Sequence, residues 1–309
     1  MKKTSIGGQA LIEGLLMIGP KSVATAIRKT NGEIVVKKKD LPPKDVLSKI
    51  PVVRGIVGFV RQLVLGMKAL MYSAEALDVD MGEEIEPTKF DKFIERIFGD
   101  KIKDAAIYFA VILAIIIGVG LFILLPNFLA DFVKINESSG TQAIIRNLLE
   151  GIIRIVIFVA YLAFASRLKD IERVWQYHGA EHKTIHCYEH GEELTADNVK
   201  KYSTKHPRCG TSFLFIVMIV SIIVFSLVGW HGKAMNILLR ILLIPIVAGI
   251  SYELLKLAGR SDSKIVQIIN APGLALQYLT TKEPDNEQIE VAIAALKSVL
   301  ENIKDEDKW

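Results

Sequence analysis

The stretch 105-AAIYFAVILAIIIGVGLFILL-125 decides the fold class, because it runs for 21 residues without a charged side chain. About 20 apolar residues in a helix cross the hydrocarbon core of a bilayer, where the backbone must satisfy its own hydrogen bonds. We therefore expect a transmembrane helix here. The sequence predicts four such spans, two within 105–166 and two within 213–257: about 105–125, 148–166, 213–229 and 237–257.

The composition agrees with a membrane protein that also has substantial water-facing parts. Of the 309 residues, 51% are hydrophobic and 23% are charged, and the mean hydropathy is +0.35. Because the charged fraction is near the ordinary value, the apolar residues must be concentrated in the spans. The formal net charge of +4 is too small to favour nucleic acid as a partner. We expect a mainly α integral membrane protein surrounded by a lipid bilayer, and the sequence leaves its oligomeric state open.

Lysine and arginine are distributed unevenly between the segments that join the spans. The first hundred residues, the segment 167–212 and the tail 258–309 are rich in both, whereas 126–143 and 230–236 contain one lysine each. Since basic loops stay in the cytoplasm, we expect a multi-pass protein of the plasma membrane with both termini and the 167–212 segment cytoplasmic. Both cysteines lie in that segment and would be reduced there.

Three water-facing segments are expected to form a small cytoplasmic α+β part. Segment 1–51 contains two strand-like runs around Asn31-Gly32, a dipeptide typical of β-hairpins, and the remainder of this segment is irregular in pattern. The His-rich segment 167–212 follows the second span. The tail 258–309 contains a helix from about Asp285 with one apolar stripe, and this helix would dock on the α+β part.

Segment 52–104 is expected to form an interfacial amphipathic helix and a linker. The helix, over about 52–77, is apolar but carries a charged residue every seven positions. These residues fall near one stripe of a helix and are Arg54, Arg61, Lys68 and Glu75. A basic stripe on an apolar helix fits the cytoplasmic membrane interface. A re-entrant or bundle-packed helix is the alternative interpretation.

Histidine and cysteine are concentrated between residues 178 and 209, where five of the six histidines and both cysteines occur. Four of these histidines follow one another at intervals of four: His178, His182, His186 and His190. Neighbours at this spacing share a helix face, so His178 with His182, or His182 with His186, could chelate one ion. His178-x-x-Glu181-His182 also matches the pattern of inverted zinc peptidases, in which the glutamate acts as the base for a metal-bound water.

The loop before the third span offers the second half of a metal site. His206-x-x-Cys209 has the spacing of a ligand pair, and with two helical histidines it would complete a tetrahedral site for a divalent transition metal, with zinc as the best match. Arg208 could bind an anionic substrate group or lipid headgroups. Glu253 could serve as ligand, base or supporting carboxylate. Glu13 is either a buried substrate-binding carboxylate or a turn residue.

These residues favour a membrane-embedded zinc hydrolase with Glu181 and Glu253 as its catalytic carboxylates. The expected substrate is a lipid-linked molecule or a membrane peptide at the cytoplasmic face. The alternative is a non-enzymatic scaffold or regulator with a structural metal site. A transporter fits less well, because the spans lack a paired set of midplane charges. Glu150 and Arg154 are interpreted as a neutralising pair near a helix start rather than as a polar pathway.

Four motifs stand out along the chain: Gly7-Gly8-Gln9-Ala10 with Glu13-Gly14, Tyr177-His178-Gly179-Ala180-Glu181-His182-Lys183, His206-Pro207-Arg208-Cys209-Gly210-Thr211-Ser212-Phe213, and Thr280-Thr281-Lys282-Glu283-Pro284. Together they resemble the YqhQ-like family of bacterial membrane proteins of unknown function, over essentially the whole chain. The resemblance implies a multi-span protein and a metal-dependent enzyme, and it supplies no substrate. Family members often have Met-Arg-Gly-Pro where this chain has Met17-Ile18-Gly19-Pro20, so a basic side chain is missing at position 18.

Overall fold

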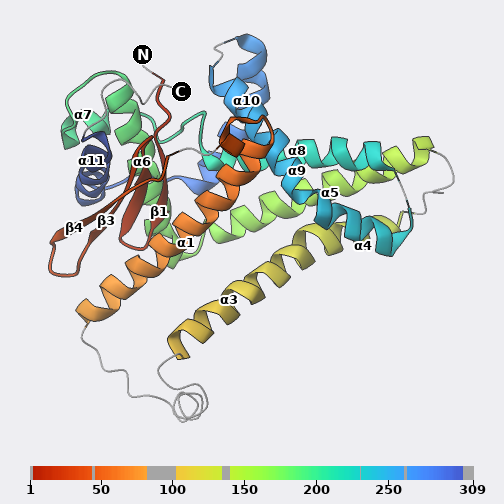
Figure 1. Ribbon diagram of the computed structural model, residues 1–309, viewed down its shortest axis with the longest axis horizontal. Helices are drawn as coiled ribbons and strands as arrows, with labels where there is room; N and C mark the ends of the chain where they lie inside the picture. The colour runs from red at the N-terminus through yellow and green to blue at the C-terminus, as the bar shows by residue number, and fades with distance from the viewer. Residues whose placement is uncertain are drawn as a thin grey trace.

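The computed structural model describes residues 3–43, 46–81, 102–133, 140–229, 231–260 and 263–301. A small sheet region lies beside a bundle of long helices (Figure 1). The elements are, in chain order, β1 (Gly7–Leu11), β2 (Gly14–Ile18), β3 (Ser22–Arg28), β4 (Ile34–Asp40), the short helix η1 (Val46–Lys49), α1 (Val53–Met81), α3 (Ile102–Val119), the π-helical turn η3 (Gly120–Leu124), α4 (Leu125–Asp131), α5 (Gly140–Ala165), α6 (Lys169–Glu189), α7 (Ala196–Lys200), α8 (Gly210–Val228), α9 (Lys233–Arg260), α10 (Lys264–Thr280) and α11 (Asn286–Leu300).

The four strands form an antiparallel meander in the order β1-β2-β3-β4. The predicted hairpin is confirmed, because β3 and β4 pair along their whole length and Gly32 takes a φ of +86° in the turn between them. The structure adds two strands to the predicted hairpin, β1 and β2, which the sequence pattern does not indicate. Their pattern is obscured by Gly7 and Gly8, which weaken a strand signal, and by Glu13, which occupies the turn between them with a φ of +48°.

Helices cover both faces of the sheet (Figure 1). Side chains alternate along β2, so that Leu15 and Met17 face a core shared with α6 and α11, whereas Leu16 faces α1. The larger core is completed by buried side chains of the two helices, among them Tyr177, Ala180, Ile289, Ala292 and Leu296. This packing holds the His-rich helix α6 firmly against the sheet.

The expected C-terminal helix is confirmed as α11. It starts with a capping box in which the Asp285 carboxylate accepts from the Gln288 N–H at 2.8 Å and the Gln288 side chain accepts from the Asp285 N–H at 3.0 Å. The tail also contains α10, which packs on α8 and was not expected as a separate helix. Its pattern is masked by Pro272, since proline ordinarily interrupts a helix.

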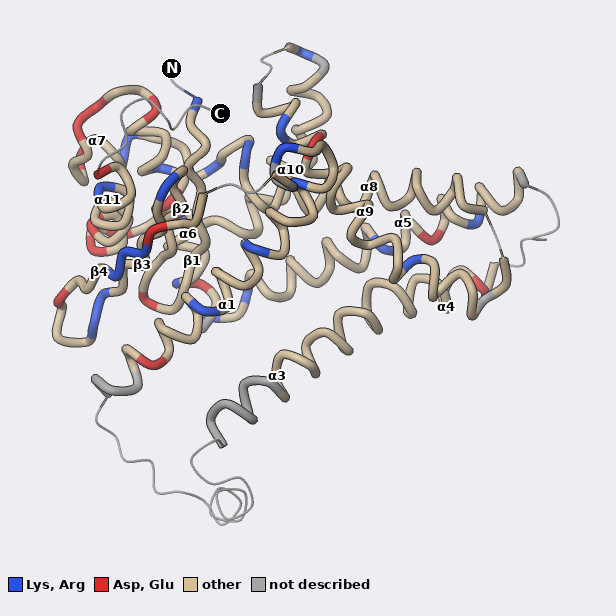
Figure 2. The backbone as a smooth tube through the Cα atoms, viewed as in Figure 1, with Lys and Arg blue, Asp and Glu red and all other residues tan. Residues whose placement is uncertain are grey.

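Five helical stretches are long and apolar enough to cross a membrane: Val53–Leu77, Phe109–Asp131, Thr141–Ala165, Gly210–Val228 and Ala234–Gly259. The last four overlap the predicted spans, with ends that differ by one to seven residues. Helix α8 packs against both α5 and α9, and these helices project together away from the sheet region (Figure 1). Charged residues are frequent on the sheet, α6 and α11 and sparse along α3, α8 and α9 (Figure 2). These features indicate a multi-pass membrane protein.

Helix α1 differs from the other candidate spans in what it contacts. By length and composition it raises the number of candidates to five, where the sequence predicts four. Its middle packs on the sheet through Leu65 and Ala69. Its first turns pack on α9, where Gly55 lies against Gly249 and Tyr252. The interfacial position of α1 and the four-span arrangement therefore stay predictions.

Substitution of Gly249 by alanine is expected to destabilise the contact between α1 and α9. The added Cβ would lie 2.6 Å from the carbonyl oxygen of Val52, and overpacking of this kind costs about 1–3 kcal/mol. The measurement is the thermal unfolding midpoint of the detergent-solubilised protein. Gly118→Ala is the matched control, because nothing lies within 4 Å of its Cβ. Equal midpoints for the two variants would contradict the close approach.

Candidate metal centre

Helix α6 carries the histidines, and a glycine within it allows the helix to approach the end of α10 closely. A Cβ at Gly179 would overlap the carbonyl oxygen of Lys282. The backbone N–H of Lys282 in turn donates to the Trp175 carbonyl at 3.0 Å. The glycine of the His-Gly-Ala-Glu-His motif therefore has a packing role, and it brings the backbone of Thr280 within reach of α6.

His178, His182 and Cys209 form a compact group whose ligand atoms all lie within 4.8 Å of one another. Nδ1 of His178 is 2.7 Å from the Thr280 carbonyl oxygen, and Nδ1 of His182 is 2.5 Å from that of Thr204. A ring whose Nδ1–H is donated to a carbonyl presents the lone pair of Nε2 in the neutral form, which is the usual arrangement of metal-binding histidines. Nε2 of His178 is 3.1 Å from the Cys209 sulfur.

Cys209 occupies the N-cap of α8, where its sulfur accepts from the Thr211 N–H at 3.3 Å. Burial alone would raise the pKa of this thiol, but His178 and His182 hold the pKa well below its usual value. For His178, burial lowers the pKa, and the neighbouring Cys209 more than offsets this and raises the pKa to about 9. The sulfur is therefore held as a thiolate beside a protonated His178, and a metal ion bound here would replace the proton on Nε2 of that ring.

Glu181 lies beside this group and is 95% buried, since only 5% of its surface is exposed. Its Oε2 has no hydrogen-bond partner among the described residues. Burial raises the pKa of Glu181, and the neighbouring His182 and His178 oppose that rise. Gly8 of β1 makes room for this carboxylate, because a Cβ there would lie 3.0 Å from Cδ of Glu181 and would also overlap the Leu16 carbonyl.

His186, Glu189 and His206 form a second group with ligand atoms within 4.8 Å of one another. The guanidinium of Arg208 already supplies a positive charge to this group. It pairs with Glu189, and its Nη2 lies 3.3 Å from Nε2 of His206. The Glu189 carboxylate also accepts from Thr4, at 2.8 Å from its N–H. A metal ion here would face the buried Arg208 charge, so the first group is the better metal site.

The Arg208 ion pair perturbs the second group strongly. Although burial raises the pKa of Glu189, the neighbouring His206 and Arg208 lower it to about 2. Burial lowers the pKa of His206 to about 3, against the opposing effect of Glu189. At neutral pH this cluster is a carboxylate held by a guanidinium next to a neutral imidazole, so the charges of the ion pair balance without a metal ion.

The structure divides the predicted ligands between the two groups. His178, His182 and Cys209 are together, with Glu181 beside them, whereas His186 and His206 belong to the second group. His206 and Cys209 were expected to bind one ion as a pair. They are separated because the His206 ring lies 4.6 Å from that of His186 and turns its Nε2 toward Glu189, at 3.6 Å.

Three other predicted residues have partners of their own. Arg208 binds Glu189, and Glu13 binds Arg173 on α6. Glu253 does not join the histidines through any contact described here, because its carboxylate pairs with Arg54 of α1, with Oε1 at 2.7 Å from Nε. The residue that the sequence analysis misses is Glu189. Its signal is its position three residues after His186 on one helix, which places both on one face.

A bundle of candidate membrane spans with a buried His/Cys cluster in an attached α+β region defines a multi-pass membrane protein of mixed architecture. The chain belongs to the family described as "Protein of unknown function (DUF1385)", whose model matches residues 50–302. It is 35% identical over 302 residues to "Uncharacterized protein YqhQ" of Bacillus subtilis (strain 168), covering 95% of this chain and 92% of the relative. No solved structure matches the chain. The resemblance to the YqhQ-like family is thereby confirmed.

Glu189→Gln is expected to destabilise the protein by about 3 kcal/mol at neutral pH, because it leaves buried Arg208 without this carboxylate. The pKa of Glu189 is lower in the folded protein, at about 2, than in an unfolded chain. Its stabilising effect is therefore complete above pH about 4.5 and is lost as the pH falls toward 2. Thermal unfolding of wild type and variant at pH 7, 5 and 3 should show a difference that shrinks with acidity.

The exposed Glu193 supplies the matched control for this comparison. Glu193→Gln should leave the unfolding midpoint within about 1 °C of wild type at each pH, since surface substitutions have small effects. A Glu189→Gln penalty that stayed constant from pH 7 to pH 3 would show that the carboxylate charge is not the source of stability.

Proposed function

We propose that this protein is a metal-dependent enzyme of the membrane, with zinc as its metal and hydrolysis as its reaction. The observation that supports this most directly is the group of His178, His182 and Cys209 with Glu181 beside it, whose Oε2 has no hydrogen-bond partner among the described residues. Imidazole and thiolate are the ligands that zinc prefers. Three protein ligands leave a fourth position, which is typical of catalytic rather than structural zinc.

Glu181 would serve as the general base. A bound zinc ion lowers the pKa of a coordinated water to about 7 and so supplies a nucleophile at neutral pH. Glu181 has an oxygen without a hydrogen-bond partner in the described residues. It lies close enough to His178 and His182 for their charges to oppose the rise of its pKa. Its raised pKa suits a group that accepts a proton and then returns it to a leaving group.

The membrane location favours an amphiphilic substrate, either a lipid-linked molecule or a membrane peptide. Cys209 immediately precedes α8, a candidate span, so the proposed centre lies where the α+β region meets the bundle. Helix α1 carries a row of exposed apolar side chains suited to the interface: Val60, Leu63, Val64 and Met67. In this proposal α1 lies in the interface, the other four candidate helices span the membrane, and the centre and both termini are cytoplasmic.

A structural metal site in a scaffold or regulator is the second candidate, and burial is the observation that favours it. His182 is 1% exposed and Cys209 is 6% exposed. A site closed by four protein ligands would stabilise the fold and leave no position for water.

Metal content measured on the purified protein tests the shared part of both candidates. Wild type is expected to hold about one equivalent of zinc or another transition metal, and Cys209→Ser and His182→Ala are expected to lose it. Cys187→Ser and His190→Ala are matched controls, because Cys187 is buried in the core and His190 is exposed outside both groups. Wild-type protein that is folded but takes up no metal on titration would overturn both candidates.

Cobalt substitution separates the enzyme from the scaffold without knowledge of the substrate. For an open site, the visible spectrum of the cobalt protein should change when azide is added, because azide takes the fourth position. Glu181→Gln should retain the metal and shift the pH at which the spectrum changes, since Glu181 is next to the bound water. A spectrum insensitive to azide and pH would favour the structural site.

A further inference from the structure

The membrane bundle contains a buried polar network between α5 and α9. Glu150 is 1% exposed and accepts from two arginines, from Arg154 at 3.0 Å and from Arg240 at 2.6 Å. Arg240 also donates to Oδ1 of Asn147 at 3.2 Å. Charged groups inside a candidate span are costly and are usually functional, so the way in which each is satisfied is informative.

The two arginines differ in how completely they are satisfied. Every guanidinium nitrogen of Arg154 has a partner, namely the Phe122 carbonyl at 2.8 Å, Ser221 Oγ at 3.0 Å and Glu150. Arg240 is 3% exposed, yet its Nη1 has no hydrogen-bond partner in the described part of the chain. Only Arg240 is therefore able to take a further acceptor.

The charges of this network do not cancel. Two guanidinium groups share the single carboxylate of Glu150. The nearby Arg146 pairs with Asp131, so that pair does not supply the missing negative charge. Among the described side chains of the network, one positive charge remains. An unbalanced charge is strongly unfavourable in a low-dielectric interior, and an anion would remove this cost.

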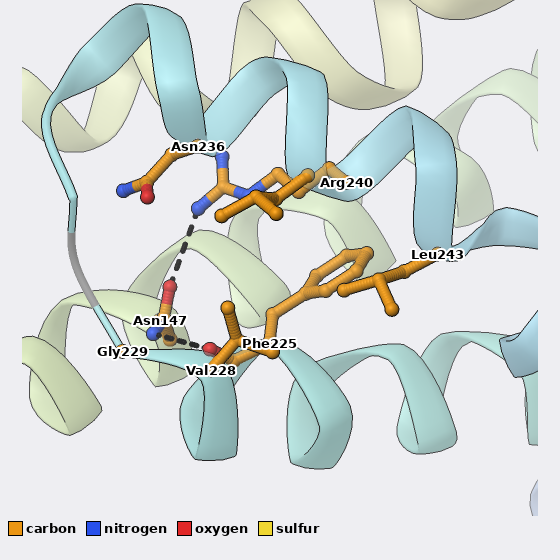
Figure 3. A pocket seen from close by; sticks show the side chains of 8 residues that line it. Asn147, Phe225, Val228, Gly229, Asn236, Arg240 and Leu243 are labelled. Carbon is orange, nitrogen blue, oxygen red and sulfur yellow. Dashed lines mark hydrogen bonds between the residues drawn. The ribbon is translucent and has the colours of Figure 1, made fainter.

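Asn236 adds a second donor at the same place. Its Oδ1 accepts from the His231 N–H at 3.0 Å, which fixes the orientation of the amide. The remaining Nδ2 is buried and has no partner among the described residues. Asn236 and Arg240 line one small cavity together with Asn147, Phe225 and the end of α8 at Val228 and Gly229 (Figure 3). Both unsatisfied atoms are donors on side chains that line this cavity, so an acceptor bound there is the group that would satisfy them.

The size and depth of the cavity limit what the acceptor can be. Its volume is about 10 Å³, which holds one water-sized group. Asn236 lies in the first turn of α9 and Arg240 about one turn further in, so the cavity is within about 10 Å of the helix end at a rise of 1.5 Å per residue. One oxygen of an oxyanion fits, with the rest of the group outside at the level of the headgroups.

We propose that Arg240 and Asn236 form an oxyanion site for a phosphate group at the end of the bundle remote from the sheet region. One phosphate oxygen accepts from Nη1 of Arg240 and Nδ2 of Asn236, and its negative charge balances the network. Arginine recognises phosphate through charge-assisted hydrogen bonds. The phosphate is either the headgroup of a phospholipid beside α8 and α9 or free inorganic phosphate. This site is independent of the metal centre.

Native mass spectrometry of the delipidated full chain in detergent tests the lipid source. The protein is titrated with phosphatidylglycerol and, separately, with a diacylglycerol of the same acyl chains that lacks the phosphate. Equilibrium binding of radiolabelled orthophosphate tests the free-ion source. Retention of phosphatidylglycerol but not diacylglycerol assigns the lipid headgroup, and saturable orthophosphate binding assigns the free ion. Binding of neither probe overturns the proposal.

Asn236→Asp is the decisive variant. It keeps the acceptor for the His231 N–H but replaces the free donor with a negative oxygen, which would pair with Arg240 and repel an anion. Binding should weaken by about tenfold or more, because a hydrogen bond to a charged group is lost. Asn198→Asp on α7 is the matched control, and it should bind as wild type does. If Asn236→Asp is not folded by size-exclusion chromatography, Asn236→Leu decides instead. Unchanged binding in a folded Asn236 variant overturns the proposal.

Discussion

The close approach of α6 to the Thr280–Lys282 segment is the contact on which the water-facing part of this protein depends. It exists because residue 179 is glycine, since any Cβ would overlap the Lys282 carbonyl. The approach lets His178 reach the Thr280 carbonyl at 2.7 Å. On the other side of α6, the absence of a Cβ at Gly8 leaves space for the side chain of Glu181. Two glycines in separate motifs thus bring the sheet, the His-rich helix and the end of α10 around one buried cluster.

Incomplete satisfaction of buried polar groups links the two proposals. The negative charge of Glu189 is balanced by the buried side chain of Arg208, which pairs with its Oε1. Glu181 has an oxygen without a described partner, and Arg240 has a nitrogen without one. Nearly all buried polar groups in folded proteins are paired, so such exceptions point to function. The first lies among groups that attract a cation, and the second carries excess positive charge.

Long apolar runs and short-range patterns could be predicted from the sequence, whereas partner choice could not. The long apolar helices, the Asn31-Gly32 hairpin, the capped helix at Asp285 and the candidate ligands on α6 are local signals, and the structure has them near the expected places. Strands β1 and β2 and the helix α10 were missed because glycines and Pro272 obscure their patterns.

The division of ligands depends on contacts between distant parts of the chain. His206 and Cys209 are three residues apart, and their spacing suggests one ion. The backbone between them turns His206 toward Glu189 and leaves Cys209 at the start of α8. Similarly, Glu253 forms an ion pair with Arg54, which is 199 positions away in the sequence. A helix spacing cannot reveal a partner that another element supplies, so these assignments need the tertiary structure.

The centre draws its parts from almost the full length of the polypeptide. Gly8 accommodates Glu181, the sulfur of Cys209 lies 3.1 Å from Nε2 of His178, and the carbonyl that orients His178 belongs to Thr280. Helix α11, which holds α6 against the sheet, ends at Leu300. Because contacts between distant residues form only when both have been synthesised, the cluster cannot be assembled while the ribosome is still making the C-terminal segment. Its histidines and Cys209 thus acquire their final arrangement only after the intervening hydrophobic segments have left the translation machinery, which makes this cluster a late event in biogenesis.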